Sequence, residues 1–182
     1  MTRVKRIRMA CELASVPSRP DRVDVSFLPW SPRLLIDHAT VLFQSFQHDP
    51  ERSTFPSLGT ETGCRDLMHA MASLPNFCPA STWLAIGSSG PVGSIQGIVL
   101  PNGYGEIQNL AVVSTVRGIG VGTELLERGF RGFQETGCAR VVLEVSASND
   151  RAIRLYRKFG FRSYKTVYLP AYGTLPTWGQ GI

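Results

Sequence analysis

The sequence contains few cysteines and no long apolar run, and these two shortages exclude several classes of protein. Its four cysteines, Cys11, Cys64, Cys78 and Cys138, form no C-x-x-C pair, so a zinc site is not indicated and we expect free thiols in a reducing cytoplasm. No stretch approaches the roughly 18 uninterrupted apolar residues that a membrane span needs. The basic start, residues 1–20, lacks the apolar core of a signal peptide. We therefore expect a cytoplasmic protein that holds no metal and does not bind membranes.

The remaining composition is typical of one folded domain. The chain has 182 residues, of which 43% are apolar and 18% charged, enough for a single α/β domain with its own core. The formal net charge of +5 is scattered along the chain, so we expect no nucleic-acid partner. A predicted last helix does carry a basic flank, formed by Arg151, Arg154 and Arg157. That flank is either a solvated face or an attraction for a polyanionic ligand.

Residues 106–133 hold the clearest local pattern. An apolar, β-prone run at residues 107–113 precedes a glycine-rich turn at residues 117–123, and apolar residues then recur at the spacing of one helix face. A helix N-terminus exposes backbone N–H groups without partners, and its dipole favours an anion. Glycines remove the Cβ atoms that would hold a phosphate away from those donors. The sequence therefore predicts a pyrophosphate site at this turn, with Arg117 adding a positive charge.

Three phosphate-binding patterns can be compared with this turn. The Walker pattern is absent, because no Gly-Lys pair occurs in the chain. The dinucleotide fingerprint requires a third glycine where Thr123 stands. Arg-x-x-Gly-x-Gly does fit, at Arg117, Gly120 and Gly122. A plain strand-to-helix turn remains the alternative for this motif alone.

Together with a second motif, this pattern resembles the acetyl-CoA signature of the GNAT superfamily of N-acetyltransferases. The second motif is a strand at residues 142–145, then Asn149, Ala152 and Tyr156 on a helix, then a Gly-Phe turn at residues 160–161. The resemblance covers about residues 104–169, and near its end it is closest to bacterial enzymes that acetylate the N-termini of ribosomal proteins. It implies the GNAT fold, in which the fourth and fifth strands splay apart and the thioester lies in the gap.

The hydrophobic patterns predict an α/β (α+β) chain with a mixed, mostly antiparallel sheet of about six to seven strands flanked by four helices. The predicted order is β-α-α-β-β-β-α-β-α-β. Strands are expected at residues 23–27, 83–86, 92–100, 104–113, 140–146 and 161–169, and helices near residues 31–46, 60–74, 121–133 and 149–158. We expect one N-acetyltransferase domain at residues 22–169, an N-terminal arm or extra edge strand at residues 1–21, and an irregular tail at residues 170–182.

Two features of the first half remain open at this point. Residues 47–58 contain two prolines and are predicted to be a loop, either a lid beside the acceptor pocket or a plain surface connection. His38 falls on the apolar face of the first helix, where a packed core histidine is favoured over a catalytic one.

The resemblance implies that acetyl-CoA binds mainly through the protein backbone. Leu110, Ala111 and Val112 would pair with the pantetheine amides like an added strand and would supply the N–H that stabilises an oxyanion. The pyrophosphate would meet Arg117 and the N–H groups of Gly118, Ile119, Gly120, Val121, Gly122 and Thr123. Asn149 would reach the pantetheine arm, or would only cap its helix.

Transfer of an acetyl group to an amine requires a proton acceptor, because an ammonium group has no lone pair. Glu106 and Glu144 match the positions that serve as base in two branches of the superfamily, and they could also share a water. A strand-edge carboxylate facing solvent is the alternative for each. Tyr156 matches the residue that donates a proton to the sulfur of CoA, and a core aromatic is its alternative.

The sequence thus predicts an N-acetyltransferase that carries an acetyl group from acetyl-CoA to a primary amine of a peptide or small molecule, by direct attack in a ternary complex. A non-catalytic acyl-CoA-binding module is the alternative. A nucleotide-binding oxidoreductase domain is disfavoured by Thr123 and by the antiparallel strands. The acceptor is not identified by the sequence, and a homodimer is suggested only by analogy with other superfamily members.

Overall fold

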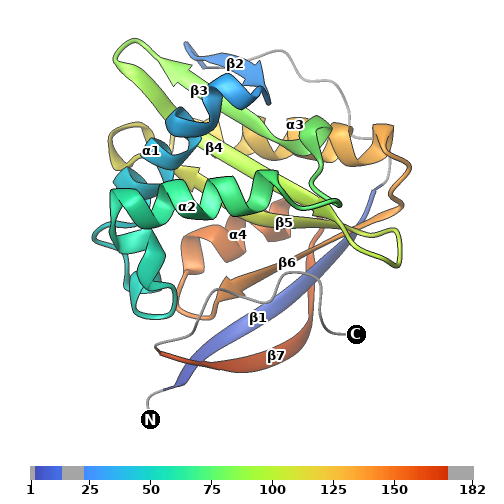
Figure 1. Cartoon of the computed structure of the whole chain (residues 1–182). Coiled ribbons are helices and arrows are strands. Elements are labelled where there is room, and N and C mark those ends of the chain that lie inside the picture. The colour runs from blue at the N-terminus through green and yellow to red at the C-terminus, as the bar shows by residue number, and fades with distance from the viewer. Residues whose placement is uncertain (1–2, 14–22, 172–182) are drawn as a thin grey trace.

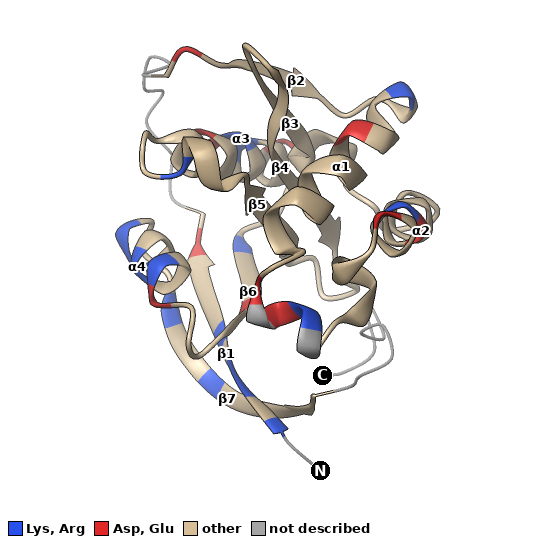
Figure 2. Ribbon diagram, turned by 90° about the vertical axis from the view of Figure 1, so that its left-hand side faces the viewer, with Lys and Arg blue, Asp and Glu red and all other residues tan. Residues whose placement is uncertain are grey.

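The computed structural model describes residues 3–13 and 23–171, which form one seven-stranded sheet in the order β2-β3-β4-β5-β6-β1-β7 (Figure 1). The strands are β1 (Arg3–Glu12), β2 (Ser26–Pro29), β3 (Trp83–Gly87), β4 (Gly90–Val99), β5 (Gly105–Val112), β6 (Arg140–Ser146) and β7 (Arg162–Pro170). The α-helices are α1 (Leu35–Phe46), α2 (Glu61–Ala72), α3 (Val121–Glu135) and α4 (Asp150–Lys158). Figure 2 shows α1 and α2 on one face of the sheet and α3 and α4 on the other.

This architecture confirms the predicted fold class, and from β2 onward the element order is the predicted one. Every neighbouring pair of strands is antiparallel except β5 and β6, which are parallel. The first predicted strand begins later than expected, at Ser26, because only Ser26–Pro29 has a partner strand, β3. Of the predicted tail, residues 172–182 lie outside the described part of the chain.

Each face of the sheet has its own hydrophobic core. The core under α3 and α4 includes the fully buried Phe130, Phe133 and Phe161, and the core under α1 and α2 includes Leu42 and Met68. The amphipathic spacing of α3 accounts for the first, since its buried residues recur on a single side. Among residues 3–13 and 23–171, no helix combines the length and the apolarity that crossing a membrane requires.

The N-terminal strand β1 lies inside the sheet, whereas the sequence predicted an arm or an edge strand. It is antiparallel to β6 on one side and to β7 on the other, with Arg8 opposite both Glu144 and Lys165. Its alternation explains this place: Met9 and Cys11 are buried in the core beneath α4, and Arg6 and Arg8 point to the opposite face. Alternation alone cannot tell an edge strand from an inner one when one face is polar.

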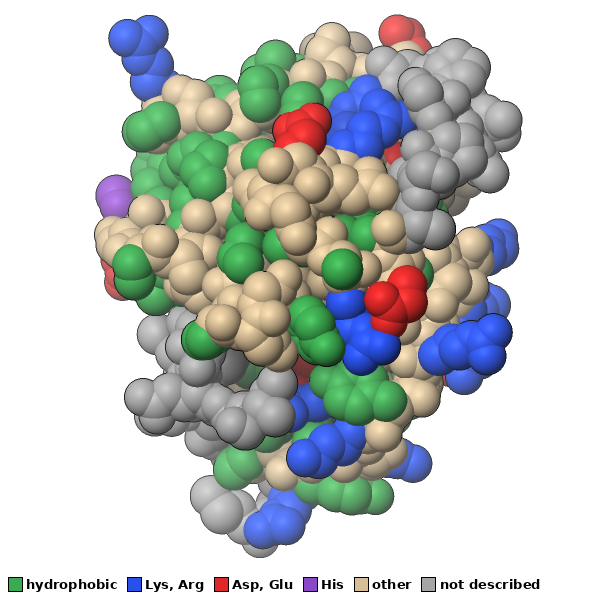
Figure 3. Space-filling model, turned by 90° about the vertical axis from the view of Figure 1, so that its right-hand side faces the viewer, with side chains coloured by type: hydrophobic (Ala, Val, Ile, Leu, Met, Phe, Trp, Pro, Cys, Tyr) green, Lys and Arg blue, Asp and Glu red, His purple; other side chains and the backbone are tan. Residues whose placement is uncertain are grey.

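The placement of β1 also gathers positive charge at one end of the molecule. Basic residues follow β1, β7 and α4 in Figure 2, and Figure 3 shows basic side chains in the lower part of the face it presents, where β1 and β7 lie. In β7 and α4 they are exposed: Arg151, Arg154, Arg157, Lys158, Arg162 and Lys165. Part of the charge that is scattered along the sequence is therefore gathered at this end of the structure.

The parallel pairing of β5 and β6 is short, and it ends in a gap. Residues Gly105–Ile107 pair with Val141–Leu143, and no pairing continues beyond them. The register between β4 and β5 shifts at the next residue, Gln108, which is the extra residue of a β-bulge. A bulge bends the strand that carries it, so β5 turns away from β6 at this point. The predicted divergence of the fourth and fifth strands is therefore present as the divergence of β5 from β6.

His38 is a core residue, as the sequence favoured. It is fully buried on α1, with Nδ1 2.6 Å from the Oγ of Ser94, and its Nε2 has no hydrogen-bond partner among the described residues. Burial lowers its pKa from 6.5 to about 4. The ring is therefore neutral in the folded protein at every pH above that value.

The fold should consequently lose stability as the pH falls from about 6.5 to about 4. In this window the unfolded chain binds a proton at His38 and the folded chain does not, which costs about 3 kcal/mol at about 1.4 kcal/mol per pKa unit. Denaturant unfolding at pH 7 and pH 4 should show this loss in the wild type, and a clearly smaller loss in His38→Gln. The exposed His69→Gln variant is the matched control; equal losses in all three proteins would contradict the assignment.

Candidate active site

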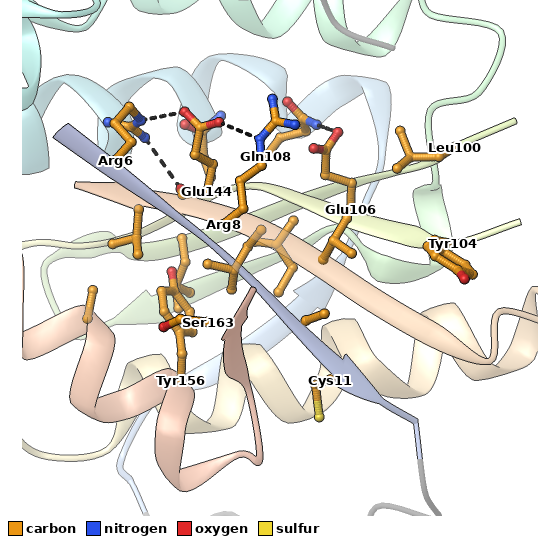
Figure 4. A pocket seen from close by; sticks show the side chains of 18 of the residues that line it. Arg6, Arg8, Cys11, Leu100, Tyr104, Glu106, Gln108, Glu144, Tyr156 and Ser163 are labelled. Atoms are coloured by element: carbon orange, nitrogen blue, oxygen red, sulfur yellow. Dashed lines mark hydrogen bonds and ion pairs between the residues drawn. The ribbon is translucent and has the colours of Figure 1, made fainter. Parts of the chain in front are cut away.

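A cavity of about 1090 Å³ passes through the gap between β5 and β6 and opens toward both faces of the sheet (Figure 4). It brings together five of the predicted site residues: Glu106, Leu110, Glu144, Asn149 and Tyr156. The predicted phosphate turn does not line this cavity and lies beside it, at the start of α3. Within the described ranges, no three or more His, Cys, Asp or Glu side chains gather as a metal site would need.

Beyond Ile107, the edge of β5 that faces β6 has no strand partner. Backbone N–H and C=O groups of residues 108–112 on that edge are available to a ligand, except the carbonyl of Val112, which accepts a bond from Arg117. Leu110 lines the cavity, whereas the side chain of Ala111 packs in the core beneath α1 and α2. An extended chain with amide groups could bind this edge as a strand would.

The glycine-rich turn has the backbone geometry of an anion cradle. Gly118 and Gly120 have φ angles of 89° and 111°, which side chains with a Cβ rarely adopt. Gly120 is the N-cap of α3, and no side chain caps that helix end. The first N–H groups of α3 therefore lack both an intrahelical acceptor and a side-chain acceptor. This arrangement supports the predicted phosphate site at residues 118–123.

The structure gives Arg117 a set of partners that the sequence did not predict. Its Nε donates to the carbonyl of Val112 at 2.8 Å, and its Nη2 donates to the carbonyl of Ser45 at 3.2 Å. These bonds tie the turn to the end of β5 and to α1. Contact between Arg117 and a phosphate stays a prediction.

Arg151 is the basic side chain that the structure places beside the turn. A Cβ built on Gly118 would lie 3.8 Å from the Nη2 of Arg151, which extends from the first turn of α4. The sequence signal was the basic flank of this helix, for which attraction of a polyanion was one of two interpretations. Arg151 was not among the predicted binding residues, because nothing local in the sequence brings residues 118 and 151 together.

Tyr156 faces the cavity from α4 and is almost completely buried. Burial, and then the nearby charge of Glu51, raise the pKa of its hydroxyl above the usual value, while Arg6 acts in the opposite direction. The hydroxyl is therefore protonated throughout the neutral range. The core-aromatic interpretation holds, since the ring packs edge-on against Phe161 at 5.6 Å, and proton donation by Tyr156 stays a prediction. Asn149 caps α4 as predicted, accepting a bond from the N–H of Ala152 at 3.1 Å.

The two predicted bases lie on the opposite side of the sheet from Tyr156, as Figure 4 shows. Burial raises the pKa of the Glu106 carboxyl, partly offset by a 2.6 Å bond from Gln108 and by the charge of Arg8. Glu144 accepts bonds from the Nε atoms of Arg6, at 2.6 Å, and of Arg8, at 3.2 Å. Burial thus prepares Glu106 to take up a proton, whereas both carboxylate oxygens of Glu144 are engaged by guanidinium groups.

Two residues that the sequence analysis did not select also line the cavity. Arg6 comes from β1, and Glu51 comes from the connection between α1 and α2. They form an ion pair at 2.6 Å. In the sequence, Arg6 lies in the basic start of the chain and Glu51 in the predicted loop at residues 47–58, so no local signal indicated that they meet.

A family model described as the acetyltransferase (GNAT) family matches residues 43–161, which is more than half of the chain. The chain belongs to the GNAT acetyltransferase family. The prediction of an N-acetyltransferase, and with it of an acyltransferase enzyme, is confirmed at the level of the family.

Curated relatives match shorter parts of the chain. The N-alpha-acetyltransferase MAK3 of Arabidopsis thaliana is 39% identical over 64 residues, which is 35% of this chain and 34% of the relative. The mycothiol acetyltransferase of Parafrankia sp. is 35% identical over 97 residues, 53% of this chain and 26% of the relative. The match thus spans about a third or less of these relatives' own length. The predicted likeness to ribosomal-protein acetyltransferases is not shown by them and stays a prediction.

Solved structures of other proteins share this chain's fold, although their sequences are only distantly similar. A GCN5-related N-acetyltransferase from Sphaerobacter thermophilus has a TM-score of 0.66 at 23% identity, over 92% of this chain and 51% of that one. AAC(6′)-Iy, in complex with the bisubstrate analogue CoA-S-monomethyl-acetylneamine, has a TM-score of 0.61 at 12% identity, over 79% of this chain and 94% of that one. These likenesses confirm the GNAT fold.

The glycine-rich turn can be tested by placing a carboxylate in it. Gly120→Glu should weaken acetyl-CoA binding by about tenfold or more, because it brings a negative charge and a Cβ to the predicted phosphate site. Gly137→Glu is the matched control, since Gly137 also has a positive φ of 84° but lies past the far end of α3. Isothermal titration of acetyl-CoA into the three proteins measures the effect, and equal loss in both variants would contradict it.

Proposed function

We propose that this GNAT protein transfers an acetyl group from acetyl-CoA to a primary amine by direct attack within a ternary complex. One observation carries the proposal: a single cavity joins the two faces of the sheet through the β5–β6 gap, with Tyr156 on one face and Glu106 on the other. A thioester that enters from the α3 and α4 face and an amine that enters from the α1 and α2 face would meet in that gap.

The residues present fit acetyl-CoA as a substrate. The unpaired edge of β5 at residues 108–112 matches an extended pantetheine chain with its amides. The turn at residues 118–123 offers backbone N–H groups to a pyrophosphate, and the exposed Arg151 lies beside it. The side-chain oxygen of Asn149 already caps α4, and its amide nitrogen is available to the pantetheine arm.

Starting from an ammonium group, the reaction removes two protons from the nitrogen, one before attack and one as the amide forms, and delivers one proton to the sulfur. We assign the first transfer to Glu106, directly or through water, since its buried carboxyl has a raised pKa. The amine nitrogen then bonds to the thioester carbon, and N–H groups of residues 110–112 stabilise the oxyanion. The carbon–sulfur bond breaks, the sulfur takes the hydroxyl proton of Tyr156, and the nitrogen releases its second proton to solvent. The products are an acetylated amine and CoA, and solvent restores both protonation states.

Glu144 is the second candidate base, and its surroundings argue for a supporting role. Both of its carboxylate oxygens accept bonds from guanidinium groups, so a proton would displace an ion pair. Binding of an acyl-CoA without turnover is the alternative function. A buried acid and a protonated tyrosine on opposite sides of one gap favour the enzyme, because binding alone requires neither.

We propose that the acceptor is a primary amine of a peptide or of a small molecule. Relatives named N-alpha-acetyltransferase favour a peptide N-terminus, and relatives named mycothiol acetyltransferase favour a small molecule. Release of free thiol from acetyl-CoA in the presence of tripeptides, amino acids or polyamines tests the function. Acetyl-CoA binding without thiol release for any amine would support the non-catalytic alternative. The cytoplasmic location, a homodimer and the lack of a nucleic-acid partner stay predictions.

The role of Glu106 has a specific pH signature. Glu106→Gln should lower kcat by about 10²–10⁴-fold with the fastest amine of the screen, because the amine loses its proton acceptor. In the wild type, kcat/KM should fall as the pH drops through the pKa of Glu106, which burial raises above its usual value. This acid limb should be absent from the variant. Glu12→Gln is the control, since Glu12 also lines the cavity but pairs with Arg140; the same limb in Glu106→Gln would refute the assignment.

A further inference from the structure

Arg6 occupies the point at which three elements that line the cavity meet. Its Nε donates to a carboxylate oxygen of Glu144 on β6 at 2.6 Å. Its Nη1 donates to a carboxylate oxygen of Glu51 at 2.6 Å, and Glu51 lies in the connection between α1 and α2. Its guanidinium carbon also lies 4.9 Å from the centre of the Phe55 ring in the same connection. Figure 4 shows this side chain on the acceptor side of the sheet.

These contacts form a balanced chain of charge that is largely shielded from water. Glu51, Arg6, Glu144 and Arg8 alternate in sign, each bonded to the next. Arg6 is only 6% exposed. Among the described residues, Glu51 forms an ion pair with Arg6 alone. Removal of one member of a buried ion pair leaves its partner without compensation, which strongly disfavours the arrangement that buried it. Loss of Arg6 would therefore release Glu51 from its present position.

The connection that Glu51 belongs to is anchored by the buried side chain of Leu58 in the core under α1 and α2, but few hydrogen bonds join it to the sheet. It consists of two short 3₁₀ turns, Pro50–Ser53 and Pro56–Gly59, whose described backbone bonds run within the connection or to the helices beside it. Within the described part of the chain, the hydrogen bond from Arg6 to Glu51 is the one that joins it to the sheet. The connection and the end of α1 contribute five residues to the cavity wall: Phe46, Glu51, Phe55, Ser57 and Leu58.

We propose that Arg6 is a positioning residue, which holds the α1–α2 connection across the β5–β6 gap and thereby shapes the acceptor side of the site. Arg6 lies outside residues 43–161, so the match to the family model assigns it no role. Arg6 pairs with both Glu51 and Glu144, and Arg140 pairs with Glu12. Of the carboxylates that line the cavity, Glu106 is therefore the one without an ion-pair partner among the described residues. The acceptor part of this inference rests on the proposed function, but the positioning part does not.

Amide hydrogen exchange tests the positioning directly and requires no acceptor. In Arg6→Met, amides of residues 54–59 should exchange about tenfold faster or more, while those of α2 keep their wild-type rates. Arg8→Met is the matched control, because Arg8 also bonds Glu144 but does not contact the connection. Arg6→Lys keeps the charge but cannot bond both carboxylates in the same fork, so it should give an intermediate effect.

A double variant and kinetic measurements distinguish this positioning role from a general loss of stability. Glu51→Gln should reproduce the faster exchange. The double variant, Arg6→Met with Glu51→Gln, should exchange little faster than either single variant, because both substitutions remove the same ion pair. With the fastest amine of the screen, Arg6→Met should raise KM for the amine about tenfold and leave the Kd for acetyl-CoA within about twofold.

Three results would overturn the proposal: wild-type exchange at residues 54–59 in Arg6→Met, equal loosening in Arg8→Met, or faster exchange spread over the whole chain. If the wild type transfers no acetyl group to any amine, the proposed function fails, and the exchange result still decides whether Arg6 holds the connection.

Discussion

The short parallel pairing between β5 and β6 is the constraint on which the site depends. Three residue pairs hold the strands together, and a bulge at Gln108 then bends β5 away. The divergence leaves a strand edge without a partner and opens a passage through the sheet. A longer pairing would close the passage, and no pairing would leave the strands without a fixed distance. The chemistry proposed for Tyr156 and Glu106 relies on this geometry, because the two residues act from opposite faces.

Inside the passage, ion pairing and burial give similar carboxylates different properties. Glu144 and Glu51 are neutralised by guanidinium groups of β1, whereas Glu106 is buried with only an amide donor. Burial raises the pKa of the Glu106 carboxyl, which has no ion-pair partner among the described residues. The N-terminal strand therefore contributes to the site through its charges, in addition to completing the sheet between β6 and β7.

Local patterns in the sequence were sufficient to predict much of the fold and part of the candidate site. The glycine-rich turn, the Asn149 cap and the strand at residues 140–146 each depend on neighbouring residues, and the structure has them where the patterns indicated. Contacts between distant segments were not accessible in the same way. Arg6 is 45 residues from Glu51 and 138 from Glu144, and no periodicity encodes such pairings. The same limit explains why β1 was expected at the sheet edge and why the bonds of Arg117 to Val112 and Ser45 were not expected.

Hydrogen exchange with and without acetyl-CoA is the most direct test of the central claim, that the substrate binds along β5 and the turn before α3. The account predicts slower exchange of backbone amides in residues 108–112 and 118–123 when acetyl-CoA is added, because those N–H groups would become donors to the ligand. Amides of β2 and β3, at the far side of the sheet, should not change. Protection confined to other segments, or none at residues 108–112, would contradict a substrate bound in the β5–β6 gap.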